Sequence, residues 1–193
     1  CQGDNMEVGS KLYFLNGTDG GVEDMQEYDP DTWTAKTSLD TANDHDRAGG
    51  CAGNPDSKYY AIGGFDGTRY DHVDEYVVDT WTAKTAANDT LQVAASFTIS
   101  DKMYTAGGIG SAGANSVAVE EYDPDTHTAK TDMDIGRREN RGFTLDGLGY
   151  TIGGRAAAET YMNDCDEYDP VGNSWTARGD IPTGYNAGIA SSG

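Results

Sequence analysis

The stretch Glu27–Thr37, with the sequence EYDPDTWTAKT, decides the fold because it returns three more times along the chain. The copies are Glu75–Thr85 (EYVVDTWTAKT), Glu121–Thr131 (EYDPDTHTAKT) and Glu167–Arg178 (EYDPVGNSWTAR). The tyrosine of each copy follows the preceding one after 48, 46 and 46 residues. Self-similarity at a period of this length is typical of repeat architectures. We therefore interpret the chain as four consecutive repeats of one structural unit.

A second signature precedes each copy of the first. It reads YAIGG at Tyr60–Gly64, YTAGG at Tyr104–Gly108 and YTIGG at Tyr150–Gly154, and YFLNG at Tyr13–Gly17 is a degenerate first copy. A β-rich run closed by glycines predicts a strand followed by a turn, because glycine adopts positive φ without strain. Two signatures in the same order four times make the repeat a strong signal.

Each repeat is predicted to contain four short strands. In the first signature the tyrosine ends one strand and the tryptophan begins the next, and the Asp-Pro-Asp-Thr between them supplies turn residues. Another strand precedes the Gly-Gly run, at Ser96–Ile99, at Gly142–Leu145 and, less apolar, at Ala48–Cys51. No segment shows the apolar period of a helix. Four strands in a unit of this length are typical of a propeller blade.

With these residues in view, the chain resembles the kelch-repeat β-propeller family over nearly its whole length. An apolar strand, Tyr-x-x-Gly-Gly, a variable loop, Glu-Tyr-Asp-Pro and a tryptophan follow one another as in a kelch blade. The departures are local: Asn16-Gly17 replaces the glycine pair, Val77-Val78 replaces Asp-Pro, and His127 replaces a tryptophan. The resemblance implies an all-β propeller of four kelch-type blades, each with four antiparallel strands.

We expect residues 1–193 to form a single kelch propeller domain. Its blades are predicted at roughly 1–46, 47–92, 93–138 and 139–184, with 185–193 starting or closing a further blade. In one arrangement the four blades close into a ring in which the last strand pairs with the strand beginning near Lys11, which removes exposed sheet edges. In the other, they are part of a larger propeller or array, since the resemblance implies rings that more often hold six or seven blades.

The composition contains two opposing signals. The chain has few large aliphatic and phenylalanine side chains, namely six Leu, seven Ile, nine Val and four Phe. Such a low content together with a net charge of −20 is typical of disordered chains. The 26 Gly, 12 Tyr and 3 Trp favour an ordered fold instead, in which burial is divided among small interfaces between blades. The negative charge disfavours nucleic acid as a partner, and no apolar run is long enough for a membrane span. A strongly hydrated surface suits an extracellular, cell-surface or virion setting.

Acidic residues recur at fixed places and raise the question of metal binding. The repeated glutamates Glu27, Glu75, Glu121 and Glu167 are expected to pair with the basic residues of the next strand rather than to form a ring of metal ligands. These partners are Lys36, Lys84, Lys130 and Arg178. The Asp-rich turns lack a recognisable calcium loop, so turn capping is the favoured interpretation and a surface calcium site is the alternative. We expect no cofactor.

The loops after the Gly-Gly runs differ in all four repeats, and variable loops on a rigid scaffold usually carry binding. Arg137, Arg138, Arg141 and Arg155 fall within the length of one repeat, and Arg69 lies in the corresponding loop of the second. The predicted binding residues are Arg69, Tyr70, His72, Arg137, Arg138, Arg155, Tyr161 and Tyr185. Kelch domains that capture acidic peptides use arginines from similar loops, so the resemblance implies a carboxylate or an acidic peptide as ligand. The alternative is that these arginines pair locally with Glu139, Asp134 and Glu159.

Catalysis finds little support in the sequence. His45, His72 and His127 have no ligand-like spacing, and the two His and the Cys-linked Tyr of kelch copper oxidases have no assignable counterparts. We expect a non-catalytic binding or scaffold module that recognises a protein or glycan partner, and further copies of itself or further blades are other possible partners. The alternatives are a structural repeat of an extracellular fibre, cell surface or virion, and a kelch-type sugar oxidase or mutarotase.

Overall fold

The computed structural model describes residues 4–8, 11–16, 24–29, 31–39, 50–54, 58–65, 67–77, 79–123 and 125–184. Regular structure in these residues is β-strand apart from one 3₁₀ turn, η1 (Ala157–Glu159), which confirms the predicted all-β class. The chain divides into two compact units, Cys1–Gln92 and Val93–Gly193. Within the described ranges, no helix is long and apolar enough to cross a membrane.

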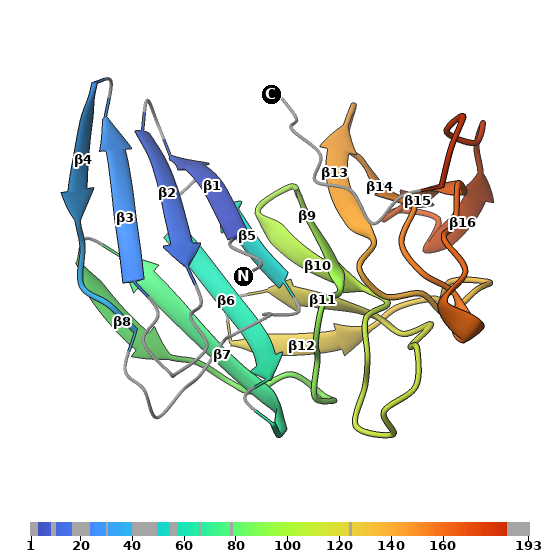
Figure 1. Cartoon of the computed structure of the whole chain (residues 1–193), viewed down its shortest axis with the longest axis horizontal. Coiled ribbons are helices and arrows are strands. Elements are labelled where there is room, and N and C mark those ends of the chain that lie inside the picture. The colour runs from blue at the N-terminus through green and yellow to red at the C-terminus, as the bar shows by residue number, and fades with distance from the viewer. Residues whose placement is uncertain are drawn as a thin grey trace. The chain divides into compact units, whose positions relative to one another are not determined.

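The first unit contains two antiparallel four-stranded sheets (Figure 1). One runs in the order β1 (Asp4–Val8), β2 (Lys11–Asn16), β3 (Asp24–Asp29) and β4 (Thr32–Ala35). The other runs in the order β5 (Gly50–Asn54), β6 (Lys58–Phe65), β7 (Arg69–Val77) and β8 (Thr80–Ala83). Each sheet follows the order of the chain, so consecutive strands always pair.

The second unit repeats this organisation. Its first sheet holds β9 (Ala95–Ile99), β10 (Lys102–Ala106), β11 (Val119–Asp123) and β12 (Thr126–Ala129). Its second sheet holds β13 (Arg141–Leu145), β14 (Leu148–Ile152), β15 (Cys165–Asp169) and β16 (Ser174–Ala177). The four strands expected in each repeat are therefore present, and the predicted first strands overlap β5, β9 and β13.

β1 lies at the edge of its sheet. It pairs with β2 from Asp4 opposite Leu15 to Val8 opposite Lys11, and β3 pairs with the other edge of β2. Residues 185–193, which we expect to start or close a further blade, lie outside the described residues.

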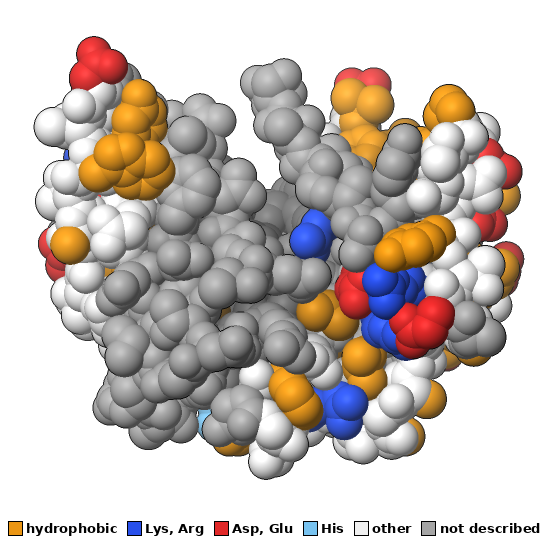
Figure 2. Space-filling model, viewed as in Figure 1, with side chains coloured by type: hydrophobic (Ala, Val, Ile, Leu, Met, Phe, Trp, Pro, Cys, Tyr) orange, Lys and Arg blue, Asp and Glu red, His pale blue; other side chains and the backbone are white. Residues whose placement is uncertain are grey.

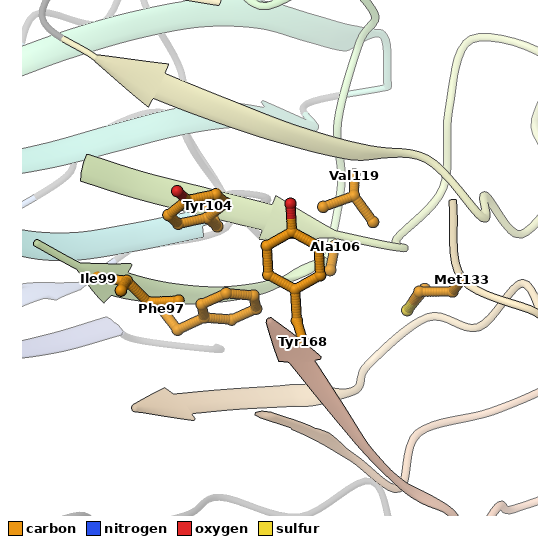
Figure 3. Close-up of a cluster of buried hydrophobic side chains, with 7 residues drawn as sticks. All are labelled: Phe97, Ile99, Tyr104, Ala106, Val119, Met133 and Tyr168. Carbon is orange, nitrogen blue, oxygen red and sulfur yellow. The ribbon is translucent and has the colours of Figure 1, made fainter. Parts of the chain in front are cut away.

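Each unit buries aromatic side chains between its two sheets. Figure 3 shows the buried cluster of the second unit, which contains Phe97, Ile99, Tyr104, Ala106, Val119, Met133 and Tyr168. Trp175 packs against this cluster. Tyr168 comes from β15, and its ring centroid lies 5.6 Å from that of Tyr104 and 6.3 Å from that of Phe97 on the other sheet. The first unit has a smaller cluster of Met25, Tyr59, Ala61 and Tyr76. Tyrosine rings therefore fill much of the core in a chain that has few large aliphatic side chains.

The repeated glutamate of the third strand has the same partners in every sheet. A tyrosine hydroxyl of the second strand donates to its carboxylate at 2.6 Å in the pairs Tyr13–Glu27, Tyr60–Glu75, Tyr104–Glu121 and Tyr150–Glu167. A basic side chain that follows the fourth strand lies beside the same carboxylate in the pairs Lys36–Glu27, Lys84–Glu75, Lys130–Glu121 and Arg178–Glu167. The predicted cross-strand pairing is therefore confirmed in all four repeats.

The repeated tryptophan joins neighbouring sheets within a unit. The indole N–H of Trp81 donates to the carbonyl of Thr37 at 2.9 Å, and that of Trp175 donates to the carbonyl of Thr131 at 2.9 Å. Both acceptors follow the last strand of the preceding sheet. Where His127 replaces tryptophan, its Nδ1 lies 3.3 Å from the carboxylate of Glu120 instead.

We expect Gly149→Ala to lower the free energy of unfolding by about 1–3 kcal/mol, the usual effect of overpacking. A Cβ at Gly149 would overlap the buried ring of Phe97, so the ring or the backbone of β14 must move. Chemical denaturation of the full chain measures the effect. Gly179→Ala is the matched control, because a Cβ there meets no atom within 4 Å. Equal losses for the two variants would contradict the packing argument.

Candidate binding surface

The backbone of the second unit places three of the predicted binding residues next to one another. The N–H of Arg138 donates to the carbonyl of Arg155 at 3.0 Å, and the N–H of Arg155 donates back at 2.8 Å. Arg155 also forms an isolated β-bridge with Tyr161, and the N–H of Met162 donates to the carbonyl of Gly154 at 3.0 Å. This short ladder holds Arg138, Arg155 and Tyr161 as neighbours.

Gly154 explains why the ladder forms at this point of the repeat. Its φ is +94°, and a Cβ at this position would lie 2.7 Å from the carbonyl oxygen of Arg138. Only glycine permits both the backbone conformation and the close approach of the neighbouring chain. The Gly-Gly signature, read in the sequence as the end of a strand, therefore also positions the arginine that follows it.

Several side chains hold the two half-buried arginines Arg138 and Arg155. Arg155 donates from Nη2 to the hydroxyl of Tyr161 at 2.7 Å, and its Cζ lies 4.8 Å from the centroid of that ring. The Nε of Arg155 lies 3.1 Å from the carboxylate of Glu139. Arg138 donates from Nη1 to Oδ1 of Asn115 at 3.0 Å. Both guanidinium groups are thus oriented before any partner arrives.

Glu159 bridges the two arginines from the 3₁₀ turn η1. One of its carboxylate oxygens accepts from Nη2 of Arg138, and the other accepts from Nη1 of Arg155 at 2.6 Å. The hydrogen bond from Arg138, followed by that from Arg155, lowers the pKa of Glu159 below its ordinary value. The predicted local pairing with Glu139 and Glu159 is therefore confirmed. On the side of the molecule where β13–β16 lies, Figure 2 shows basic and acidic side chains in contact beside hydrophobic ones.

Arg137 differs from the expectation that it contacts a partner. Its side chain is only 1% exposed, and its Nη2 pairs with the carboxylate of Asp166. Its Nη1 also lies 3.5 Å from the carbonyl oxygen of Asp164. Burial lowers the pKa of Arg137, and the nearby charge of Asp164 opposes that shift. Arg137 therefore pairs with Asp166, which is not among the expected partners Glu139, Asp134 and Glu159.

Three other predicted residues lie together in the first unit, on β7. The guanidinium carbon of Arg69 lies 5.4 Å from the centroid of the Phe65 ring. The rings of Tyr70 and His72 are stacked, with centroids 5.0 Å apart and an interplanar angle of 21°. Arg69, Tyr70 and His72, which we call the group on β7, are half-buried and lie along one strand. Tyr185, the remaining predicted residue, lies outside the described residues.

Sequence reasoning missed Asn115 as a member of the surface. Its Oδ1 accepts from Arg138, and its Nδ2 donates to the carbonyl of Arg155 at 2.8 Å. Asn115 lies in the variable loop that follows Gly107-Gly108, but the residue itself carries no charge and belongs to no motif. We define the rim surface as Asn115, Arg138, Glu139, Arg155, Glu159 and Tyr161. Its two arginines and two glutamates leave it with no net charge in a chain of net charge −20.

The rim surface carries side chains that suit binding of a ligand. Arginine donors and an exposed tyrosine ring, 49% exposed at Tyr161, suit recognition of a carboxylate beside an apolar or ring-shaped group. Among the described residues, no group of three or more His, Cys, Asp and Glu side chains is placed to hold a metal ion. The predicted absence of a cofactor stays a prediction.

Comparisons with known proteins bear on the fold alone. No family model matches the chain, and no curated protein matches it. Among solved structures 163 chains match. One of them, described as the structure of YjhT, superposes with a TM-score of 0.79 at 14% identity. The match covers 94% of this chain and 66% of that one, so this chain spans just under two thirds of the length of that structure.

Proposed function

We propose that the chain is a kelch-type β-propeller, or part of one, that acts as a non-catalytic binding module for a protein or glycan partner. Four sheets with the same order of strands, each built from the same two signatures, support the propeller interpretation. The likeness in fold to a longer chain, of which the match covers 66%, is compatible with a larger array of blades. The four sheets then correspond to the four predicted blades.

One observation carries the binding proposal. The position directly after the Gly-Gly pair is Arg155 in the fourth repeat, but it is Phe65 in the second and Ile109 in the third. The repeat therefore folds without an arginine at this position. Arg155 is nevertheless held by Tyr161 and Glu139, with Arg138 beside it. Oriented charged groups that the scaffold does not need are typical of binding surfaces.

We expect Arg155→Ala to weaken binding of the partner by about tenfold or more, since it removes a charge-assisted hydrogen bond at an oriented site. Arrays of peptides and of glycans, probed with the wild-type chain, identify candidate partners, and titration of each then measures its affinity. Arg69→Ala is the matched control, because it removes an arginine from the group on β7.

Two results would contradict the proposal. One is that the wild-type chain binds no probe on either array, as a purely structural repeat would. The other is that Arg155→Ala leaves the affinity for every bound probe unchanged. If Arg69→Ala lost binding and Arg155→Ala did not, the result would indicate that the partner binds at the group on β7.

A further inference from the structure

The carboxylate of Glu159 occupies the place where a ligand carboxylate would bind. Its two oxygens accept from two different guanidinium groups, Nη2 of Arg138 and Nη1 of Arg155. Paired hydrogen bonds from guanidinium groups to both oxygens of one carboxylate are a strong and specific form of recognition. The chain thus fills its own carboxylate site with a side chain from the turn η1.

The arginines stay oriented if Glu159 moves away. Arg138 keeps its hydrogen bond to Asn115 at 3.0 Å. Arg155 keeps the hydroxyl of Tyr161 at 2.7 Å and the carboxylate of Glu139 at 3.1 Å. The donors that Glu159 releases therefore remain beside each other and available to another carboxylate. A site that keeps its shape without its occupant loses little free energy to reordering when a ligand binds.

Several features make Glu159 the easiest member of the rim surface to displace. Its side chain is 61% exposed, whereas that of Glu139 is 18% exposed. Water competes strongly for exposed ion pairs, so they hold weakly. Both glutamates have a positive φ, +61° at Glu159 and +57° at Glu139, so the exposure of the side chain is what distinguishes them. No side-chain hydrogen bond caps the turn η1 that carries Glu159.

We propose that Glu159 is an internal competitor for the site and that an acidic peptide segment of a partner binds by replacing its carboxylate. This inference rests on the binding function proposed above and names the class of partner. A peptide is favoured over a glycan because the present occupant is itself a glutamate, carried by the turn η1, whose capping residues Ala156 and Thr160 are in extended conformation. A partner's glutamate side chain can follow the same path to Arg138 and Arg155.

Charge supports this arrangement. The rim surface has no net charge when Glu159 is included. Without the charge of Glu159, the two arginines are balanced by one glutamate of the rim surface, Glu139. Removing one negative charge at this point therefore creates a local positive site on a strongly acidic chain. The affinity for a carboxylate should rise more than the change in net charge alone produces, because the freed donors contact the ligand directly.

Titration calorimetry of the full chain at low salt tests the inference. The probes are a short oligoglutamate with blocked ends, the corresponding oligoglutamine, and an oligogalacturonate as a carboxylated glycan. We expect Glu159→Gln and Glu159→Ala to bind oligoglutamate about tenfold more tightly than the wild type does. Their affinity for oligoglutamine should equal that of the wild type. The gain should disappear when Arg155→Ala is added. Asp132→Asn is the matched control, since it removes the same charge from another exposed position.

The calorimetry results distinguish the internal competitor, the class of partner and the proposed binding function. Unchanged affinity in both Glu159 variants, or an equal gain in Asp132→Asn, would overturn the internal competitor. A gain for oligogalacturonate without one for oligoglutamate would overturn the peptide as the partner class. If no variant binds any of these probes while the arrays still show a partner that depends on Arg155, the internal competitor is overturned and the proposed binding function stands.

Discussion

Tyr168→Ala should lower the free energy of unfolding by about 3–5 kcal/mol, the range for removing a buried aromatic side chain. The side chain of Tyr168 is fully buried and packs against Phe97 and Tyr104 of the neighbouring sheet (Figure 3). Alanine at this position leaves a cavity at the centre of the largest cluster described in the second unit. Denaturation in urea, followed by tryptophan fluorescence, measures the change.

Tyr168→Phe is the matched control for this prediction. It keeps the ring and removes only the hydrogen bond from the hydroxyl to Oδ1 of Asn173 at 2.8 Å. Because that oxygen also accepts from the N–H of Thr131 at 2.9 Å, it keeps a partner, and we expect a loss of about 1 kcal/mol or less. Losses of similar size in the two variants would show that packing between the sheets is not what holds this unit together.

Lowering the pH from about 5 to 2 should destabilise the chain through its repeated glutamates. The hydrogen bond from Tyr13, ahead of those from Lys11 and Lys36, lowers the pKa of Glu27 to about 2. For Glu121 burial raises the pKa, but hydrogen bonds from Tyr104 and from the two flanking lysines outweigh it and lower the pKa to about 2. The pKa of Glu75 is lowered by Tyr60, Lys58 and Lys84 against the effect of burial, and that of Glu167 is lowered by Arg178 and Tyr150.

These lowered pKa values make the folded chain less stable as the pH falls. A carboxylate whose pKa is lower in the folded chain stabilises it fully above the unfolded value, near 4.5 for glutamate here. That stabilisation is lost as the pH falls from about 4.5 towards 2. The contribution is on the order of 2 kcal/mol each for Glu27 and Glu121, whose side chains are 7% and 10% exposed. Urea denaturation at a series of pH values measures it.

Glu121→Gln isolates one of these sites. It should lower stability at neutral pH, because Lys102 and Lys130 lose their common partner, and it should reduce the slope of stability against pH below 4.5. Asp132→Asn, an exposed carboxylate, should change neither quantity by much. A wild-type stability that stays level between pH 5 and 2 would rule out the glutamate clusters as its source.

Adjacent arginines show why the candidate site was only partly predictable. Arg137 and Arg138 look equivalent in the sequence, yet Arg137 is buried on Asp166 while Arg138 faces Glu159 at the surface. Successive side chains of an extended segment point to opposite sides. The backbone pairing of Arg138 with Arg155 decides which arginine points outward. No sequence motif predicts that pairing.

The sequence by itself determined the four repeats, their four strands each and the pairing of the repeated glutamates with lysine or arginine. These features recur because every sheet must form the same turns and satisfy the same buried groups, so repetition reveals them. The tertiary structure alone decided the strand order at β1, the burial of Arg137 and the bridge that Glu159 forms between Arg138 and Arg155. These depend on which loops meet in space, and contacts made once in a chain leave no periodic trace in its sequence.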